Sequence, residues 1–114
     1  MARIVVADND HDALELALTD LRLEGHDVFG AHDAAEAQAL VDEVAPDVVV
    51  LDHRMPPGIT GLELAERLRR ADPVLRVVIY SNYRQVQLRA RAAAIDVPFL
   101  PKGNLRALRA AVCP

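Results

Sequence analysis

The sequence predicts an α/β domain built on one parallel β-sheet with helices on both faces, and three observations support this fold class. Short runs rich in Val, Ile and Leu alternate with longer stretches of helical periodicity, which gives five β-α units in 114 residues. Parallel neighbours in a sheet need crossover connections, and the intervening helices provide them in a right-handed sense. The length is close to that of one domain, so residues 1–114 are expected to form a single unit.

Each expected strand is a short apolar run. Residues 3–7 (RIVVA) and 48–51 (VVVL) are continuously apolar apart from the first arginine, as in strands that are buried on both faces. Residues 28–30 form a shorter run after the first helix, and residues 76–80 (RVVIY) supply a fourth strand. Residues 97–100 are the fifth expected strand.

The expected helices are recognised by their spacing and by the residues that begin and end them. Residues 11–24 carry leucines at helical spacing and are followed by a glycine stop, and residues 84–95 are rich in Ala and Arg. The other three helices begin at capping residues, namely Asp33, Thr60 and Asn104, and the Thr60 cap is part of a capping-box motif (TGLE).

Two prolines fix the place of the last strand. Pro98 and Pro101 have no backbone N–H, so the strand that carries them cannot be central in the sheet. Their nitrogens point to opposite edges in a regular strand, so one of them is expected at the strand's end. A terminal fifth strand agrees with the doubly wound order 2-1-3-4-5, which is flavodoxin-like.

The composition excludes several classes of protein. Apolar residues make up 52% and charged residues 26%, as in a folded globular chain rather than a disordered one. The single cysteine, Cys113, cannot form an internal disulfide or a multi-cysteine zinc site. No apolar run approaches the length of a membrane span, and no leader peptide is visible, so a cytoplasmic location is expected.

Charge is divided unevenly along the chain. Residues 1–72 hold 6 basic and 16 acidic residues, a balance of −10, whereas residues 73–114 hold 7 basic residues and one acidic residue, a balance of +6. Such a division can mark a face that binds a partner, although uneven decoration of a small domain's surface is an equally good reading. Direct nucleic-acid binding is not expected, because no DNA-reading helix pair or aromatic platform is present.

Polar residues that could carry chemistry follow four of the expected strands. Asp8-Asn9-Asp10 follows the first strand, Asp52 the third, Ser81-Asn82 the fourth and Lys102 the fifth. In the order 2-1-3-4-5 these strands are neighbours, and ligands of open parallel sheets bind beyond the carboxyl ends of the strands. We therefore expect these side chains to meet in one crevice.

A cluster of carboxylates needs cations, and this requirement indicates the chemistry. Lys102 supplies one positive charge, and Mg²⁺ bound by oxygen ligands is the expected second. These groups suit phosphoryl transfer to a carboxylate, with Asp52 as the nucleophile and the Ser81 hydroxyl as a hydrogen-bond donor to the phosphoryl group.

At these positions the chain resembles the response-regulator receiver domains of two-component signalling, the CheY-like family. The resemblance covers the whole chain and rests on four segments, IVVADND, PDVVVLDHRMPPGITGLEL, VVIYSNY and FLPKGNL. It implies Asp52 as the phosphoacceptor, and Asp8, Asp52, Asn9 and the backbone carbonyl of Arg54 as the metal site. It further implies Ser81, Lys102 and Phe99 as phosphate-contact and switch residues.

Four departures from the family pattern bear on function. Asn9 stands where the second metal-binding acid is usual, which predicts weak Mg²⁺ binding. The loop from Met55 to Gly61 is one residue longer than usual, and Gly103 replaces the proline that normally follows the lysine. Phe99 occupies the position of the switch aromatic and lacks a tyrosine's hydroxyl. Asp10 can compensate for Asn9 through a water molecule, or can simply cap the first helix.

The resemblance also implies partners and a lifetime for the phosphorylated state. A histidine kinase or a phosphotransfer protein would donate the phosphoryl group, and the chain would not act on a separate substrate. Arg54 and Tyr83 fall where they would shield the acyl phosphate from water. An output protein or a second copy would bind a basic face formed by the fourth helix, fifth strand and fifth helix, whose arginines are Arg84, Arg89, Arg91, Arg106 and Arg109.

Two other functions remain open at the level of sequence. The chain could be a degenerate receiver that binds proteins without being phosphorylated, and Asn9 is the residue that favours this. It could also be a flavodoxin-like binder of a nucleotide or flavin, although no loop after a strand is glycine-rich enough to cradle such phosphates.

Overall fold

Five parallel strands form one sheet in the order β2-β1-β3-β4-β5, which confirms the predicted topology. The computed structural model describes residues 1–82 and 85–113. The strands are β1 (Arg3–Ala7), β2 (Asp27–Ala31), β3 (Val48–Leu51), β4 (Arg76–Tyr80) and β5 (Phe99–Leu100). The helices are α1 (His11–Leu23), α2 (Ala34–Val44), α3 (Gly61–Ala71), α4 (Val86–Ala94) and α5 (Leu105–Val112).

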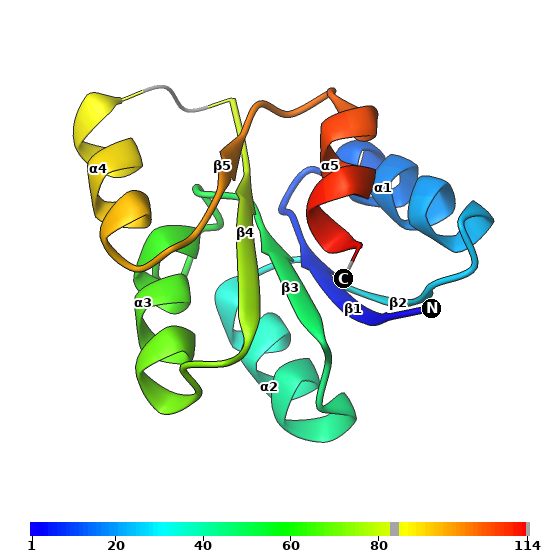
Figure 1. The fold of residues 1–114 in the computed structure, drawn as a ribbon, viewed down its shortest axis with the longest axis horizontal. Coiled ribbons are helices and arrows are strands. Elements are labelled where there is room, and N and C mark those ends of the chain that lie inside the picture. Colours follow the sequence, from blue (N-terminus) through cyan, green and yellow to red (C-terminus); the bar gives the residue numbers. More distant parts are fainter. Residues whose placement is uncertain (83–84, 114) are drawn as a thin grey trace.

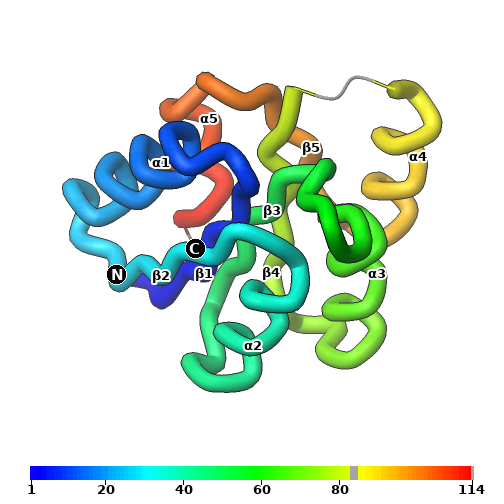
Figure 2. The backbone as a smooth tube through the Cα atoms, turned by 180° about the vertical axis from the view of Figure 1, so that it is seen from behind, coloured from blue at the N-terminus to red at the C-terminus, as the bar shows by residue number. Residues whose placement is uncertain are grey.

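The helices cover the sheet in two groups. Figure 1 shows α1 and α5 on one face and α2, α3 and α4 on the other, and Figure 2 shows the same division from behind. Each face has its own apolar core, one containing Leu14 and Leu108, the other containing Leu62 and Leu88. β3 lies in the middle, and all four of its residues are buried, as its continuous apolar run predicts.

The predicted helix starts are present. The side chain of Asp10 caps α1, that of Asp33 caps α2 and that of Asn104 caps α5. Thr60 and Glu63 form the predicted capping box at the start of α3. None of the described helices is long and apolar enough to cross a bilayer.

The last strand is shorter than expected. β5 contains only Phe99 and Leu100, because Pro98 and Pro101 flank it and neither can donate a ladder hydrogen bond. Pro98 still accepts a bond from the backbone N–H of Ile79 at 2.9 Å. As predicted, β5 lies at the edge of the sheet. The fourth helix, expected over residues 84–95, spans Val86–Ala94, and residues 83 and 84 lie outside the described part.

Candidate functional site

The polar residues that follow β1, β3, β4 and β5 converge at the carboxyl edge of the sheet. Asp8 and Asp52 are held side by side because their strands pair in parallel register, and the backbone N–H of Asp52 donates to Ala7 at 2.9 Å. Ser81 follows β4, and its backbone N–H donates to Leu100 of β5. Asp8, Asp52 and Ser81 are all buried, although each is polar. Buried polar groups away from a structural role are candidates for chemistry.

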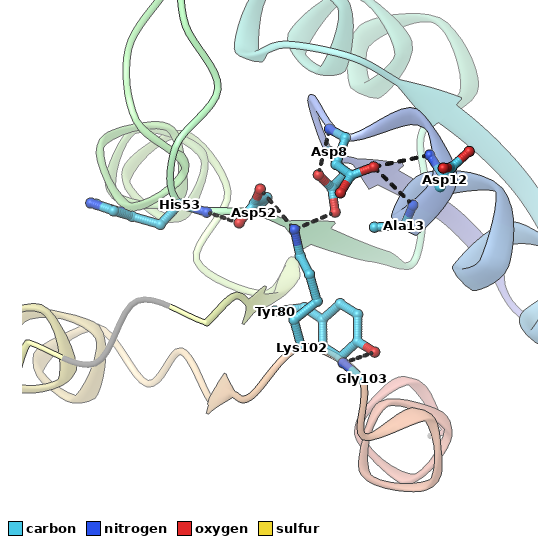
Figure 3. Close-up of polar contacts among 9 residues, drawn as sticks. Asp8, Asp12, Ala13, Asp52, His53, Tyr80, Lys102 and Gly103 are labelled. Carbon is cyan, nitrogen blue, oxygen red and sulfur yellow. Dashed lines mark hydrogen bonds and ion pairs between the residues drawn. The ribbon is translucent and has the colours of Figure 1, made fainter.

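Lys102 bridges the two carboxylates. Its ammonium nitrogen lies 2.8 Å from Asp8 Oδ2 and 3.1 Å from Asp52 Oδ2 (Figure 3). The lysine side chain is only 18% exposed, and the carboxylates are 5% and 8% exposed, so solvent screens these contacts weakly. One positive charge therefore faces two negative charges in a partly desolvated site.

The protonation equilibria reflect this arrangement. Burial raises the pKa of Asp8 above its ordinary value, although hydrogen bonds from Lys102 and from the backbone of Asp10 partly oppose the shift. Burial disfavours the charged form of Lys102, but the hydrogen bonds to Asp8 and Asp52, together with the charges of these carboxylates, outweigh it and raise the pKa of the lysine. Lys102 is therefore a permanent cation at neutral pH.

Backbone groups orient both carboxylates. Asp8 Oδ1 accepts a hydrogen bond from the N–H of Asp10 at 2.9 Å, and Asp52 Oδ1 accepts from the N–H of His53 at 2.8 Å. Asp10 in turn accepts from the backbone N–H of Asp12 and of Ala13 at the start of α1. Of the two roles considered for Asp10, the structure shows the helix cap.

An open cleft of about 360 Å³ gives access to Asp52. Its lining comes from the loops after β1, β3, β4 and β5, and consists of Asn9, Asp52, Arg54, Pro56, Ser81, Asn82 and Lys102. Lys102 and Ser81 both line this cleft, so a group that reaches Asp52 through it would pass near an ammonium and a hydroxyl.

The donor set fits a hard divalent cation. Asp8 and Asp52 supply carboxylate oxygens, Asn9 supplies an amide oxygen, and Mg²⁺ prefers oxygen ligands of these types. Within the described residues, no three side chains from His, Cys, Asp and Glu gather as a metal site. A third protein ligand from this part of the chain would therefore be an amide or backbone oxygen, as predicted for Asn9 and the carbonyl of Arg54.

Sequence comparison identifies the family. The pattern described as "Response regulator receiver domain" matches residues 4–112. The chain belongs to this family.

Curated relatives of the receiver domain are longer proteins. It is 34% identical over 114 residues to the DNA-binding response regulator MtrA of Mycolicibacterium smegmatis, covering 95% of this chain and 49% of MtrA. It is 39% identical over 82 residues to the response regulator GacA of Pseudomonas aeruginosa, covering 69% of this chain and 37% of GacA. The chain thus spans half or less of these relatives.

Solved structures share the whole fold of the receiver domain. The response regulator TrrA of Thermotoga maritima, in complex with Mg²⁺-BeF, superposes with a TM-score of 0.87 at 28% identity, covering 98% of this chain and 96% of TrrA. A CheY-like receiver domain from Methanospirillum hungatei superposes with a TM-score of 0.86 at 23% identity, covering 95% of this chain and 87% of that one. The second comparison supports the fold alone.

The two residues predicted to act as a switch, Ser81 and Phe99, have different surroundings. Ser81 lines the cleft, whereas Phe99 is half-buried against the core beneath α3 and α4. The guanidinium of Arg89 lies 5.4 Å from the centroid of the Phe99 ring, a cation–π distance. Tyr83, predicted to shield the site, lies outside the described residues.

Two residues that position the site were given no role from the sequence. Gly61 donates its N–H to His53 at 2.7 Å, and a Cβ at Gly61 would overlap the backbone carbonyl of Asp52. The Tyr80 hydroxyl accepts a hydrogen bond from the backbone N–H of Gly103 at 2.8 Å. The glycine at a helix start was visible in the sequence, but its close approach to Asp52 was not.

The arginines predicted to form one basic face have different surroundings. Arg91 pairs with Glu66 of α3 at 2.6 Å, and Arg109 pairs with Asp20 of α1 at 2.8 Å. Arg106 is exposed, and Arg84 lies outside the described residues. At least two members of the set are therefore already engaged within the receiver domain.

Proposed function

We propose that this receiver domain accepts a phosphoryl group on Asp52 from a histidine kinase or a phosphotransfer protein. One observation carries the proposal: the Asp52 carboxylate faces an open cleft while Lys102 Nζ lies 3.1 Å from its Oδ2. A nucleophile that is accessible and has a fixed cation beside it suits an incoming phosphoryl group, whose charge the lysine can neutralise.

The transfer is a displacement at phosphorus. An Asp52 oxygen forms a bond to phosphorus while the bond from phosphorus to the donor nitrogen breaks, and that electron pair remains on the donor imidazole. Lys102 stabilises negative charge on the phosphoryl oxygens, and the Ser81 hydroxyl donates a hydrogen bond to one of them. The chain modifies only itself, so we do not assign it a separate substrate.

Mg²⁺ would neutralise charge between the carboxylates and the phosphoryl oxygens. Asp8, Asp52, Asn9 and the backbone carbonyl of Arg54 are the groups that would hold it. TrrA, which is 28% identical to this chain, was solved in complex with Mg²⁺-BeF, and this supports Mg²⁺ as the cation. Because Asn9 carries no charge, we expect the binding to be weak.

Phosphorylation would be signalled through α4, β5 and α5. Movement of Ser81 toward the phosphoryl group frees space into which Phe99 can turn, a change between two packings. Arg89, which now lies over Phe99, would then change its position on the surface. An acidic partner or a second copy would read this change, with an affinity that falls as salt rises.

The proposal is tested with a small acyl phosphate and intact-protein mass spectrometry. In the presence of Mg²⁺ the mass should rise by one phosphoryl group, and a chelator should suppress the gain. A chain that stays unmodified at saturating Mg²⁺ would instead be a degenerate receiver, which binds partners without this reaction.

A further inference from the structure

We propose that Tyr80 is a positioning residue for Lys102: its hydroxyl anchors the backbone of Gly103 and so holds the lysine ammonium between Asp8 and Asp52. The inference rests on the proposed function, in which Lys102 contacts the phosphoryl group. Tyr80 itself has no place in the cleft that gives access to Asp52.

Lys102 lies in a segment with little regular structure of its own. β5 ends at Leu100, and α5 begins at Leu105, so Lys102 belongs to the short loop between them. The bond from Asn104 N–H to Pro101 is long, at 3.4 Å, whereas the bond from Gly103 N–H to Tyr80 is 2.8 Å. Of these two hydrogen bonds, the one to the tyrosine is therefore the shorter.

Tyr80 is well placed to act as an anchor. It is the last residue of β4, it pairs with Leu100 of β5, and it is 5% exposed within the core beneath α1 and α5. An aromatic ring packed in this way has few accessible rotamers, so its oxygen is fixed relative to the sheet. Figure 3 shows the ring beside the loop, with its hydroxyl directed at Gly103 and the lysine reaching the carboxylates.

Gly103 is suited to receive this contact. Its φ is +97°, in the left-handed region that L side chains rarely adopt, and a Cβ there would meet nothing within 4 Å. Glycine is therefore required by the backbone conformation and not by lack of space. That conformation directs the Gly103 N–H toward the tyrosine, one residue after Lys102.

Anchoring matters because a lysine side chain is intrinsically mobile. Its four-carbon stem has many rotamers, and ordering them opposes the formation of a fixed ion pair. A backbone hydrogen bond on the neighbouring residue removes part of that freedom before the ammonium meets Asp8 and Asp52. We expect loss of the anchor to leave Lys102 charged and present but less often in contact with both carboxylates.

The test uses the fact that Lys102 is the sole lysine in the 114-residue sequence. An amine-reactive reagent, with peptide mapping to separate Lys102 from the amino terminus, reports the accessibility of this one side chain. Tyr80→Phe keeps the ring and removes the acceptor oxygen. Labelling of Lys102 should become about two- to tenfold faster, the range expected for one lost hydrogen bond, and phosphorylation of Asp52 should slow by a similar factor.

Two further variants make the result specific. Gly103→Ala strains the same backbone and should also speed labelling, and combining it with Tyr80→Phe should add little because both act on one bond. Asn104→Ala removes the α5 cap in the same loop but leaves the Tyr80 contact, so it should label like the wild type. Circular dichroism tests whether each variant is folded. If Tyr80→Phe does not fold, the labelling rate of Gly103→Ala alone decides whether the backbone at Gly103 positions Lys102.

The outcomes are distinct. The proposal is overturned if Lys102 is labelled at the wild-type rate in both Tyr80→Phe and Gly103→Ala. It is also overturned if Lys102 is labelled as fast in Asn104→Ala as in Tyr80→Phe. Because labelling needs no phosphorylation, it also separates this proposal from the proposed function. If Tyr80→Phe labels faster but the wild type never gains a phosphoryl group, the Tyr80 anchor is supported and Asp52 is refuted as a phosphoacceptor.

Discussion

The backbone carbonyl of Asp52 occupies the space that a side chain on Gly61 would need. The first turn of α3 thereby packs directly against the end of β3 that is followed by Asp52, and the N–H of Gly61 donates to the His53 carbonyl at 2.7 Å. Neither contact involves a side chain at position 61. Because Gly61 has no Cβ, α3 can approach closely enough to pack against the backbone of Asp52.

Gly61→Ala is expected to disturb both stability and phosphorylation. The new methyl group meets backbone atoms, which cannot rotate away, so α3 or the Asp52 segment must shift. Overpacking of this kind costs about 1 to 3 kcal/mol, which denaturant unfolding would measure. The rate at which an acyl phosphate phosphorylates Asp52 should also fall.

Gly58→Ala is the matched control, because a Cβ there would make only an ordinary contact, 4.0 Å from Ala34. Gly58 lies in the loop that leads into α3, three residues before Gly61, and its substitution should be close to neutral. Equal stability of the two variants would show that the approach of Gly61 to Asp52 does not matter.

Asn9→Asp is expected to tighten Mg²⁺ binding. Asn9 lines the cleft beside Asp52 and offers a neutral amide oxygen, which a carboxylate would replace with a full charge. The gain should be about 1 to 2 kcal/mol, the range of charge-assisted contacts, as measured by calorimetry with Mg²⁺.

Asn82→Asp separates a direct ligand from a general charge effect. Asn82 lines the same cleft from the loop after β4, so the substitution adds the same charge at another position. It should tighten Mg²⁺ binding less than Asn9→Asp does. If the two variants bind Mg²⁺ equally, residue 9 is not a ligand.

Arg54→Ala is expected to shorten the lifetime of the acyl phosphate. Arg54 lines the cleft and is large enough to restrict the approach of water to Asp52. The phosphorylated variant, freed of donor, should lose its phosphoryl mass faster than the wild type. Tyr83→Ala is expected to act in the same direction. Equal or slower decay in both variants would refute shielding by these side chains.

Arg109→Ala is expected to cost more stability than Arg106→Ala on the same helix. Arg109 pairs with Asp20 at 2.8 Å across α1 and α5, and the Asp20 side chain is only 17% exposed. Losing this partly shielded pair should cost about 1 kcal/mol, whereas the exposed Arg106 should change unfolding by less than about 0.5 kcal/mol. A cycle with Asp20→Ala would measure the coupling, and zero coupling would contradict a structural role for Arg109.

The sequence was informative wherever backbone periodicity decides the outcome. The proximity of Asp8, Asp52 and Lys102 could be predicted because each follows a strand, and the carboxyl ends of parallel strands lie at one edge of the sheet. The capping box at Thr60 was equally predictable, because its two partners, Thr60 and Glu63, lie within one helical turn.

Contacts between distant side chains were not predictable from the sequence. Arg109 and Asp20 are 89 residues apart, and Arg91 and Glu66 are 25 apart, so arginines that suggest a free basic face are partly neutralised within the fold. The hydrogen bond between Tyr80 and Gly103 depends on the path of the loop between β5 and α5, which the periodicity of the sequence does not predict. The shortness of β5 shows that two prolines act more strongly than the apolar pattern between them.

Mass spectrometry of Asp52→Asn tests the central claim most directly. Wild type, Asp52→Asn and Asp10→Asn are incubated with an acyl phosphate and Mg²⁺, and intact masses are compared. Asp10 is the control because its carboxylate caps α1, a role that asparagine can also fill. We predict one added phosphoryl group on the wild type and on Asp10→Asn, and none on Asp52→Asn. A phosphoryl group that persists on Asp52→Asn would contradict the assignment of Asp52 as the phosphoacceptor.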